Sequence, residues 1–100
     1  MVYSKFTIKN VNGQQMALIN IEDNKCNTLI NTIFIYDKIL TKEDNGTKKI
    51  YFGKSYIKFN NNYLTVHIED LNVVNTSIFK FNTSEMIGLK YQINKEIGKQ

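Results

Sequence analysis

Apolar and polar residues alternate through the first part of the chain and predict antiparallel strands. The alternation covers residues 2–10 and returns over residues 15–22, after an Asn12-Gly13 pair. Asn-Gly is the strongest short signal for a hairpin turn, because both residues tolerate positive φ. Pairing about this turn places Phe6 opposite Ile19, so apolar side chains meet on one face. We therefore predict a hairpin here.

A nearly continuous apolar segment, TLINTIFIYDKIL, occupies residues 28–40. Strands that are buried on both faces have this pattern, so we predict a buried central strand. A helix over the same residues is the alternative, because Leu29, Ile33, Tyr36 and Leu40 would then lie on one stripe. The density of Ile and Thr favours the strand.

A second Asn-Gly turn, Asn45-Gly46, connects this segment to residues 48–70, which hold the most distinctive sequence of the chain. Pairing about the turn sets Glu43 opposite Lys48, a favourable cross-strand pair. It also sets Ile39 opposite Phe52 and Thr41 opposite Ile50. The strand before the turn is thus tied to the strand after it.

The parity of the inward residues changes at Gly53, where we predict a β-bulge or a sharp bend. A third turn at Asn61-Asn62 then pairs Phe59 with Leu64 and Lys54 with Glu69. The inward residues of this hairpin are Ile57, Phe59, Leu64, Val66 and Ile68. Its outward face carries Lys54, Tyr56, Lys58, Tyr63, Thr65 and His67.

The C-terminal part holds a predicted strand at residues 77–82 and an ambiguous segment at residues 84–97. Strict alternation of Ile87, Leu89, Tyr91 and Ile93 favours a strand in the second segment. A helix that begins at a Ser84 cap, with Met86, Ile93 and Ile97 on one face, is the alternative. We predict the strand.

Together these elements predict one all-β domain over residues 1–100. We expect a small antiparallel barrel or sandwich of six to seven short strands, joined by tight Asn-Gly and Asn-Asn hairpins. The alternative is an α+β fold with one helix, at residues 28–40 or 84–97.

The positive charge of the chain is concentrated in one short segment. The formal net charge is +4, and Lys48, Lys49, Lys54 and Lys58 fall within eleven residues that hold no acid. All thirteen basic residues are lysine, and lysine positions a nucleic-acid backbone without reading base edges. Any contact with nucleic acid should therefore be salt-sensitive and weakly sequence-specific. Lysine and asparagine in excess, without arginine or proline, indicate an AT-rich genome such as that of a phage or virus.

Other classes of function find little support. Cys26 is the only cysteine and His67 the only histidine, so no disulfide and no structural zinc site is expected, and no other cofactor is indicated. No nucleophile or acid is placed to make His67 a general base, so we expect no enzymatic activity. No signal peptide or membrane span is seen, which predicts a cytoplasmic protein without membrane contact.

The first functional hypothesis is a non-enzymatic module that binds single-stranded nucleic acid, with bases stacked on tyrosines and lysines on phosphates. The alternative is a small phage- or virus-encoded inhibitor, similar in kind to anti-defence or anti-CRISPR proteins, that binds a host protein. Edge strands could also pair two copies into a homodimer. Either hypothesis uses the same predicted residues: Lys48, Lys49, Tyr51, Lys54, Tyr56, Lys58, Tyr63 and His67.

Overall fold

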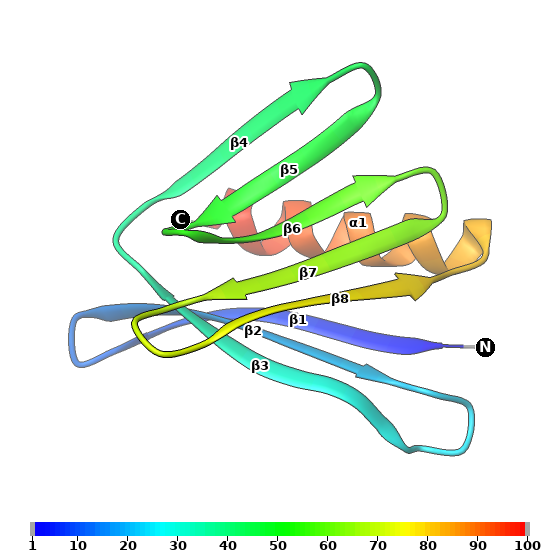
Figure 1. The fold of residues 1–100 in the computed structure, drawn as a ribbon, viewed down its shortest axis with the longest axis horizontal. Coiled ribbons are helices and arrows are strands. Elements are labelled where there is room, and N and C mark those ends of the chain that lie inside the picture. The colour runs from blue at the N-terminus through cyan, green and yellow to red at the C-terminus, as the bar shows by residue number, and fades with distance from the viewer. Residues whose placement is uncertain (1, 100) are drawn as a thin grey trace.

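A computed structural model describes residues 2–99, which form eight strands in two antiparallel sheets and a C-terminal helix (Figure 1). The predicted mostly β fold is confirmed, together with the alternative that adds one helix to it. The elements are β1 (Tyr3–Val11), β2 (Gln14–Glu22), β3 (Thr28–Tyr36), β4 (Ile39–Asp44), β5 (Thr47–Phe52), β6 (Ser55–Asn60), β7 (Tyr63–Glu69), β8 (Val74–Lys80) and α1 (Thr83–Gly98).

Each sheet is a meander in which consecutive strands are neighbours. The first sheet has the order β1-β2-β3 and the second the order β4-β5-β6-β7-β8. Three predicted pairs are confirmed: Phe6 pairs with Ile19, Glu43 with Lys48, and Phe59 with Leu64. Both residues of Asn12-Gly13 and of Asn45-Gly46 have positive φ, as the expected hairpin turns require.

The apolar segment at residues 28–40 forms strands, but not the single central strand that was predicted. Asp37 and Lys38 interrupt it, and the chain passes there from the first sheet to the second. β3 is also an edge strand, and the prediction of burial on both faces is wrong. Phe34 is buried, whereas Ile33 and Ile35 are 52% and 57% exposed on the opposite face.

Gly53 belongs to a hairpin turn rather than to a bulge or bend within one strand. Phe52 pairs with Ser55, so Gly53-Lys54 is a two-residue turn between β5 and β6. Gly53 has φ +65°, and a Cβ there would lie 4.0 Å from the Ile35 carbonyl oxygen. Lys54 therefore does not pair with Glu69. The Ser55 hydroxyl takes that place, accepting from the Glu69 N–H and donating to its carbonyl oxygen.

The strand predicted for residues 84–97 is wrong, and the alternative helix is confirmed. Asn82, not Ser84, is the N-cap: its side chain accepts from the Glu85 N–H, and the Glu85 carboxylate accepts from the Asn82 N–H. This reciprocal capping box satisfies two backbone donors that would otherwise be free. The buried positions of α1 are Met86, Leu89 and Ile93, which have helical spacing.

One apolar core joins the two sheets and the helix. Figure 1 shows α1 passing behind β5, β6 and β7. Phe52 lies at the centre of the core, with ring centroids 5.1 Å from Phe34, 5.4 Å from Tyr36 and 6.0 Å from Phe6. Because these three rings come from the first sheet and Phe52 from the second, the aromatic contacts hold the sheets together.

Polar side chains of α1 cover the free edge of β1. The Gln92 amide accepts from the Phe6 N–H and donates to the Ser4 carbonyl, while Glu96 accepts from the Ile8 N–H at 3.0 Å. Glu85 accepts from the Val2 N–H in the same way. The helix thus supplies the hydrogen bonds that a neighbouring strand would make, and it closes this edge to strand addition.

Acid should weaken this edge contact. Hydrogen bonds lower the pKa of both carboxyls: the Asn82 N–H is the main cause at Glu85, and the Lys99 side chain, followed by the Ile8 N–H, at Glu96. A carboxyl whose pKa is lower in the folded state stabilises the fold at pH values above its pKa in the unfolded chain, about 4.3. This stabilisation is lost as the pH falls through the pKa of the folded state. Urea midpoints measured from pH 6 to pH 3 should fall less steeply for Glu96→Gln than for the wild type. Parallel curves would contradict the role of Glu96.

No helix within residues 2–99 is long and apolar enough to cross a bilayer.

Candidate nucleic-acid interface

Three lysines lie side by side across the outer face of the five-stranded sheet. Lys42 of β4 pairs directly with Lys49 of β5, and Lys49 pairs directly with Lys58 of β6. We call these three residues the lysine row. Like charges directly opposite one another on a sheet are destabilising, so the row carries a cost to the fold.

An aromatic row runs parallel to the lysine row on the same face. Tyr51 of β5 pairs with Tyr56 of β6, and Tyr56 pairs with His67 of β7. The ring centroids of Tyr56 and His67 are 4.6 Å apart, with only 20° between the planes, which is a stacked arrangement. Tyr51 and Tyr56 are 5.4 Å apart and tilted by 53°. We call Tyr51, Tyr56 and His67 the aromatic row.

Two of the three lysines lean over the rings. The Lys49 ammonium lies 4.7 Å from the Tyr56 centroid and 5.9 Å from that of Tyr51. Lys42 lies 5.6 Å from the Tyr51 centroid. Each contact attracts the ammonium to the negative face of the ring. The two rows therefore form one connected surface of cations and rings.

Hydrogen bonds hold the His67 ring in place at the end of the aromatic row. Nδ1 lies 2.8 Å from the Thr76 hydroxyl on β8, and Nε2 lies 3.2 Å from a carboxylate oxygen of Glu69. The ring is stacked on Tyr56 and bonded at both nitrogens. It thus orients Tyr56 and leaves the histidine without a nitrogen to act on a substrate.

Among residues 2–99, no ion pair is recorded for the three lysines of the row. The ion pairs recorded within residues 2–99 are His67–Glu69 and Lys99–Glu96. A shallow depression of about 450 Å³ lies over the row, and Asp44 at the β4–β5 turn is the one acid on its wall. The remaining lining residues are Lys42, Asn45, Thr47, Lys49, Tyr51 and Lys58. The surface therefore suits an anionic ligand.

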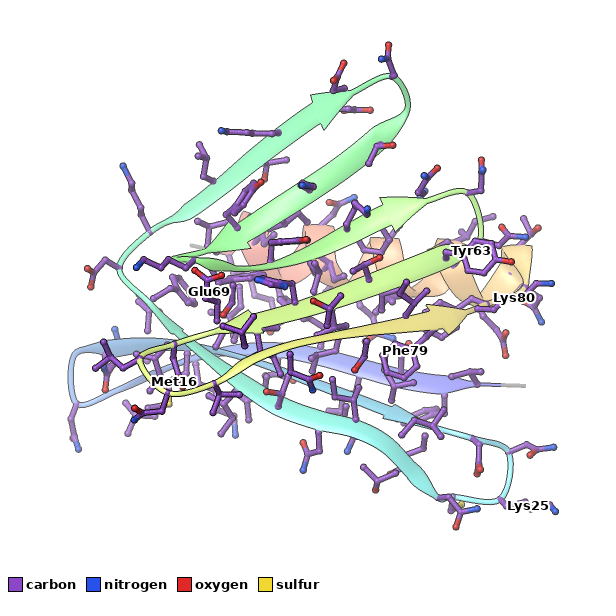
Figure 2. The ribbon with its side chains drawn as sticks, in the orientation of Figure 1. Met16, Lys25, Tyr63, Glu69, Phe79 and Lys80 are labelled. Atoms are coloured by element: carbon purple, nitrogen blue, oxygen red, sulfur yellow. The ribbon has the colours of Figure 1, made fainter. Side chains whose placement is uncertain are left out.

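The structure brings together five of the eight predicted site residues and separates the other three. The five that belong to the two rows are Lys49, Tyr51, Tyr56, Lys58 and His67. Lys48 lies on the opposite face, where its ammonium is 3.3 Å from the Asn94 side-chain oxygen of α1. Lys54 lies in the β5–β6 turn. Tyr63 has the parity of His67 and so shares the outer face, but it lies at the far end of β7 from Glu69, opposite Lys80 and outside both rows (Figure 2).

Lys42 is the residue that the sequence prediction missed. It lies outside the basic segment, between Thr41 and the acidic pair Glu43-Asp44. The signal was present in the register of the β4–β5 hairpin. A hairpin that pairs Thr41 with Ile50 and Glu43 with Lys48 also pairs Lys42 with Lys49.

Neither a metal site among the described residues nor a known relative indicates a function for this chain. Within residues 2–99 no group of three His, Cys, Asp or Glu side chains is placed to hold a metal ion. Comparison of the chain with protein-family models, with curated proteins and with solved structures finds no match. The geometry of the lysine and aromatic rows is therefore the main guide to function.

Proposed function

We propose that this chain is a non-enzymatic module that binds single-stranded nucleic acid with little sequence preference. The binding surface is the outer face of the five-stranded sheet, and its central residues are the lysine and aromatic rows. Three lysines supply positive charge to the phosphates, and no arginine is present for bidentate reading of a base.

The lysine row is the observation that carries this proposal. Cross-strand partners of like charge weaken a sheet unless a group of opposite charge offsets their repulsion. Phosphates of a bound strand would do so, because neighbouring strands space the lysine backbones about 4.8 Å apart and the row spans about 10 Å. The flanking rings and the depression add contact area on the same face.

A salt series tests the proposal. Fluorescence anisotropy would measure the affinity for labelled twelve-nucleotide dT and U strands between 50 and 200 mM NaCl. Three phosphate contacts predict a slope of log affinity against log salt of about −2, hence a loss of about 20-fold over this range. Absence of binding at 50 mM, or a slope near zero, would count against the proposal.

A protein partner is the second candidate, and a different surface supports it. On the outer face of the three-stranded sheet, Met16 pairs with Ile35 and Leu18 with Ile33. The two isoleucines are more than half exposed, although outward positions of such sheets are usually polar. Contiguous exposed apolar side chains are typical of protein-binding surfaces. This face would suit an inhibitor that docks on another protein.

The salt series also separates the two candidates. A chain that acts only through Met16, Leu18, Ile33 and Ile35 would show no affinity for either strand at 50 mM salt, since these four side chains carry no charge to attract phosphate. The homodimer through edge strands stays a prediction, and the helix-covered edge of β1 is not available to it.

A further inference from the structure

We infer that the lysine and aromatic rows on the outer face of the five-stranded sheet hold the phosphate backbone of the ligand and do not stack its bases. The ammonium groups of the lysine row and the hydroxyls of Tyr51 and Tyr56 would be the donors. This inference rests on the proposed function and specifies its chemistry: the ligand is recognised as a chain of phosphodiesters, whatever bases it carries.

Both faces of the Tyr56 ring are already covered by protein groups. His67 is stacked on one side at 4.6 Å. On the other side lie the tilted ring of Tyr51 and the Lys49 ammonium, 4.7 Å from the Tyr56 centroid. A base needs an open ring face to stack on. Tyr56, the central ring of the row, does not offer one.

The other two members of the aromatic row are covered as well. Tyr51 has Tyr56 on one side, and the ammonium groups of Lys42 and Lys49 lie within 5.9 Å of its centroid. His67 is stacked on Tyr56, and its side chain is only 15% exposed. The stacking of bases on tyrosines, which the sequence suggested, therefore lacks its platforms in this row.

Ring edges, and not ring faces, are what the aromatic row presents outward. Side chains on a strand stand roughly perpendicular to the sheet. Tyr51, Tyr56 and His67 come from neighbouring strands and contact one another sideways, so the far ends of the two tyrosines point away from the sheet. Those ends carry hydroxyls, each of which has one hydrogen to donate.

The two rows together have the spacing of a phosphate-binding strip. Lys49 and Tyr51 are two residues apart on β5, as are Lys58 and Tyr56 on β6, so the Cα atoms of each lysine and tyrosine lie about 7 Å apart along the strand. A phosphate between the rows could accept hydrogen bonds from one lysine ammonium and from one tyrosine hydroxyl. Contacts to phosphate oxygens carry no base information.

Tyr63 provides a matched comparison inside the chain. It is 47% exposed at the far end of β7, where it pairs with Asn60 and Lys80, and no ring or cation contact is recorded for it within residues 2–99. Tyr63 is thus the tyrosine of the sheet whose ring face is open. Removing its hydroxyl should leave binding unchanged, because it lies outside both rows.

The test compares two strands and three proteins by fluorescence anisotropy at 50 mM NaCl. The strands are a twelve-nucleotide dT and a twelve-nucleotide abasic chain with the same phosphates. The proteins are the wild type, the double variant Tyr51→Phe/Tyr56→Phe and the control Tyr63→Phe, each checked by thermal melting. Phenylalanine keeps the ring and removes only the hydroxyl.

We expect the abasic strand to bind the wild type within about fivefold of dT. The double variant should lose at least about tenfold, and Tyr63→Phe should match the wild type. Abasic binding weaker by more than fivefold, or wild-type affinity in the double variant, would overturn the inference and leave the proposed function standing. Failure of the wild type to bind dT would overturn both.

Discussion

Lys58→Glu is expected to weaken single-strand binding by about tenfold or more and, at the same time, to make the fold slightly more stable. Counterion release makes each phosphate contact worth about eightfold in affinity at 50 mM salt. The variant loses one contact, and its carboxylate also repels the neighbouring phosphates. The loss should therefore exceed that of Lys58→Ala.

The gain in stability follows from the lysine row. Lys58 lies directly opposite Lys49, and within residues 2–99 no ring contact is recorded for Lys58. A glutamate at this position replaces a repulsive cross-strand pair with an attractive one. Such pairs are worth roughly 0.2–1 kcal/mol, so the free energy of unfolding should rise by about 0.5 kcal/mol.

Lys5→Glu is the matched control for this pair of measurements. It makes the same change in net charge on the outer face of the other sheet, where Lys5 pairs with Asn20. Its affinity for dT should fall less than threefold. Anisotropy and urea denaturation would measure both variants. If Lys58→Glu and Lys5→Glu lost affinity equally, net charge alone would explain the binding. If Lys58→Glu were less stable than the wild type, the proposed repulsion between Lys49 and Lys58 would be contradicted.

Local turn chemistry made most of the strand pairing predictable. Asn12-Gly13, Asn45-Gly46 and Asn61-Asn62 each mark a turn whose flanking residues can be paired in only one way if apolar residues are to share a face. Gly53 was misread because a change in parity suits either a bulge or a two-residue turn. Distinguishing them requires knowing that β6 folds back on β5.

Long-range contacts decided what local patterns could not. In residues 84–97, alternation and helical spacing were both present, and the helix forms because Asn82 and Glu85 cap it and Met86, Leu89 and Ile93 reach the core. The alternating Ile87 and Tyr91 are 63% and 67% exposed. The covering of the β1 edge depends on residues more than eighty positions apart, which no local pattern reveals.

The candidate site was predictable in part for the same reason. Counting charge along the chain found Lys49 and Lys58 but included Lys48, whose parity matches that of Ile50 and places it on the inner face. Listing the cross-strand partners of Lys49 identifies Lys42, which pairs with it directly. The stacking of Tyr56 on His67 depends on ring orientation, which the sequence does not specify.

Phe52→Ala is expected to give the largest loss of stability in the chain. Phe52 is 1% exposed, and its ring contacts Phe34, Tyr36 and Phe6 across the two sheets. Truncating a buried phenylalanine costs about 3–5 kcal/mol, because transfer energy is lost and a cavity remains. For a domain of this size that is a fall in melting temperature of roughly 15 °C or more.

Comparison with Leu64→Ala shows whether Phe52 joins the two sheets or only fills the core as other buried residues do. Leu64 is also fully buried, but it pairs within the second sheet, with Phe59 and Phe79. Its loss should be smaller, about 2–4 kcal/mol. If Phe52 joins the sheets, protection of β3 and β5 amides against hydrogen exchange should fall together in Phe52→Ala, whereas Leu64→Ala should spare β3. Loss of less than 1 kcal/mol in Phe52→Ala would show that the aromatic contacts do not hold the two sheets together.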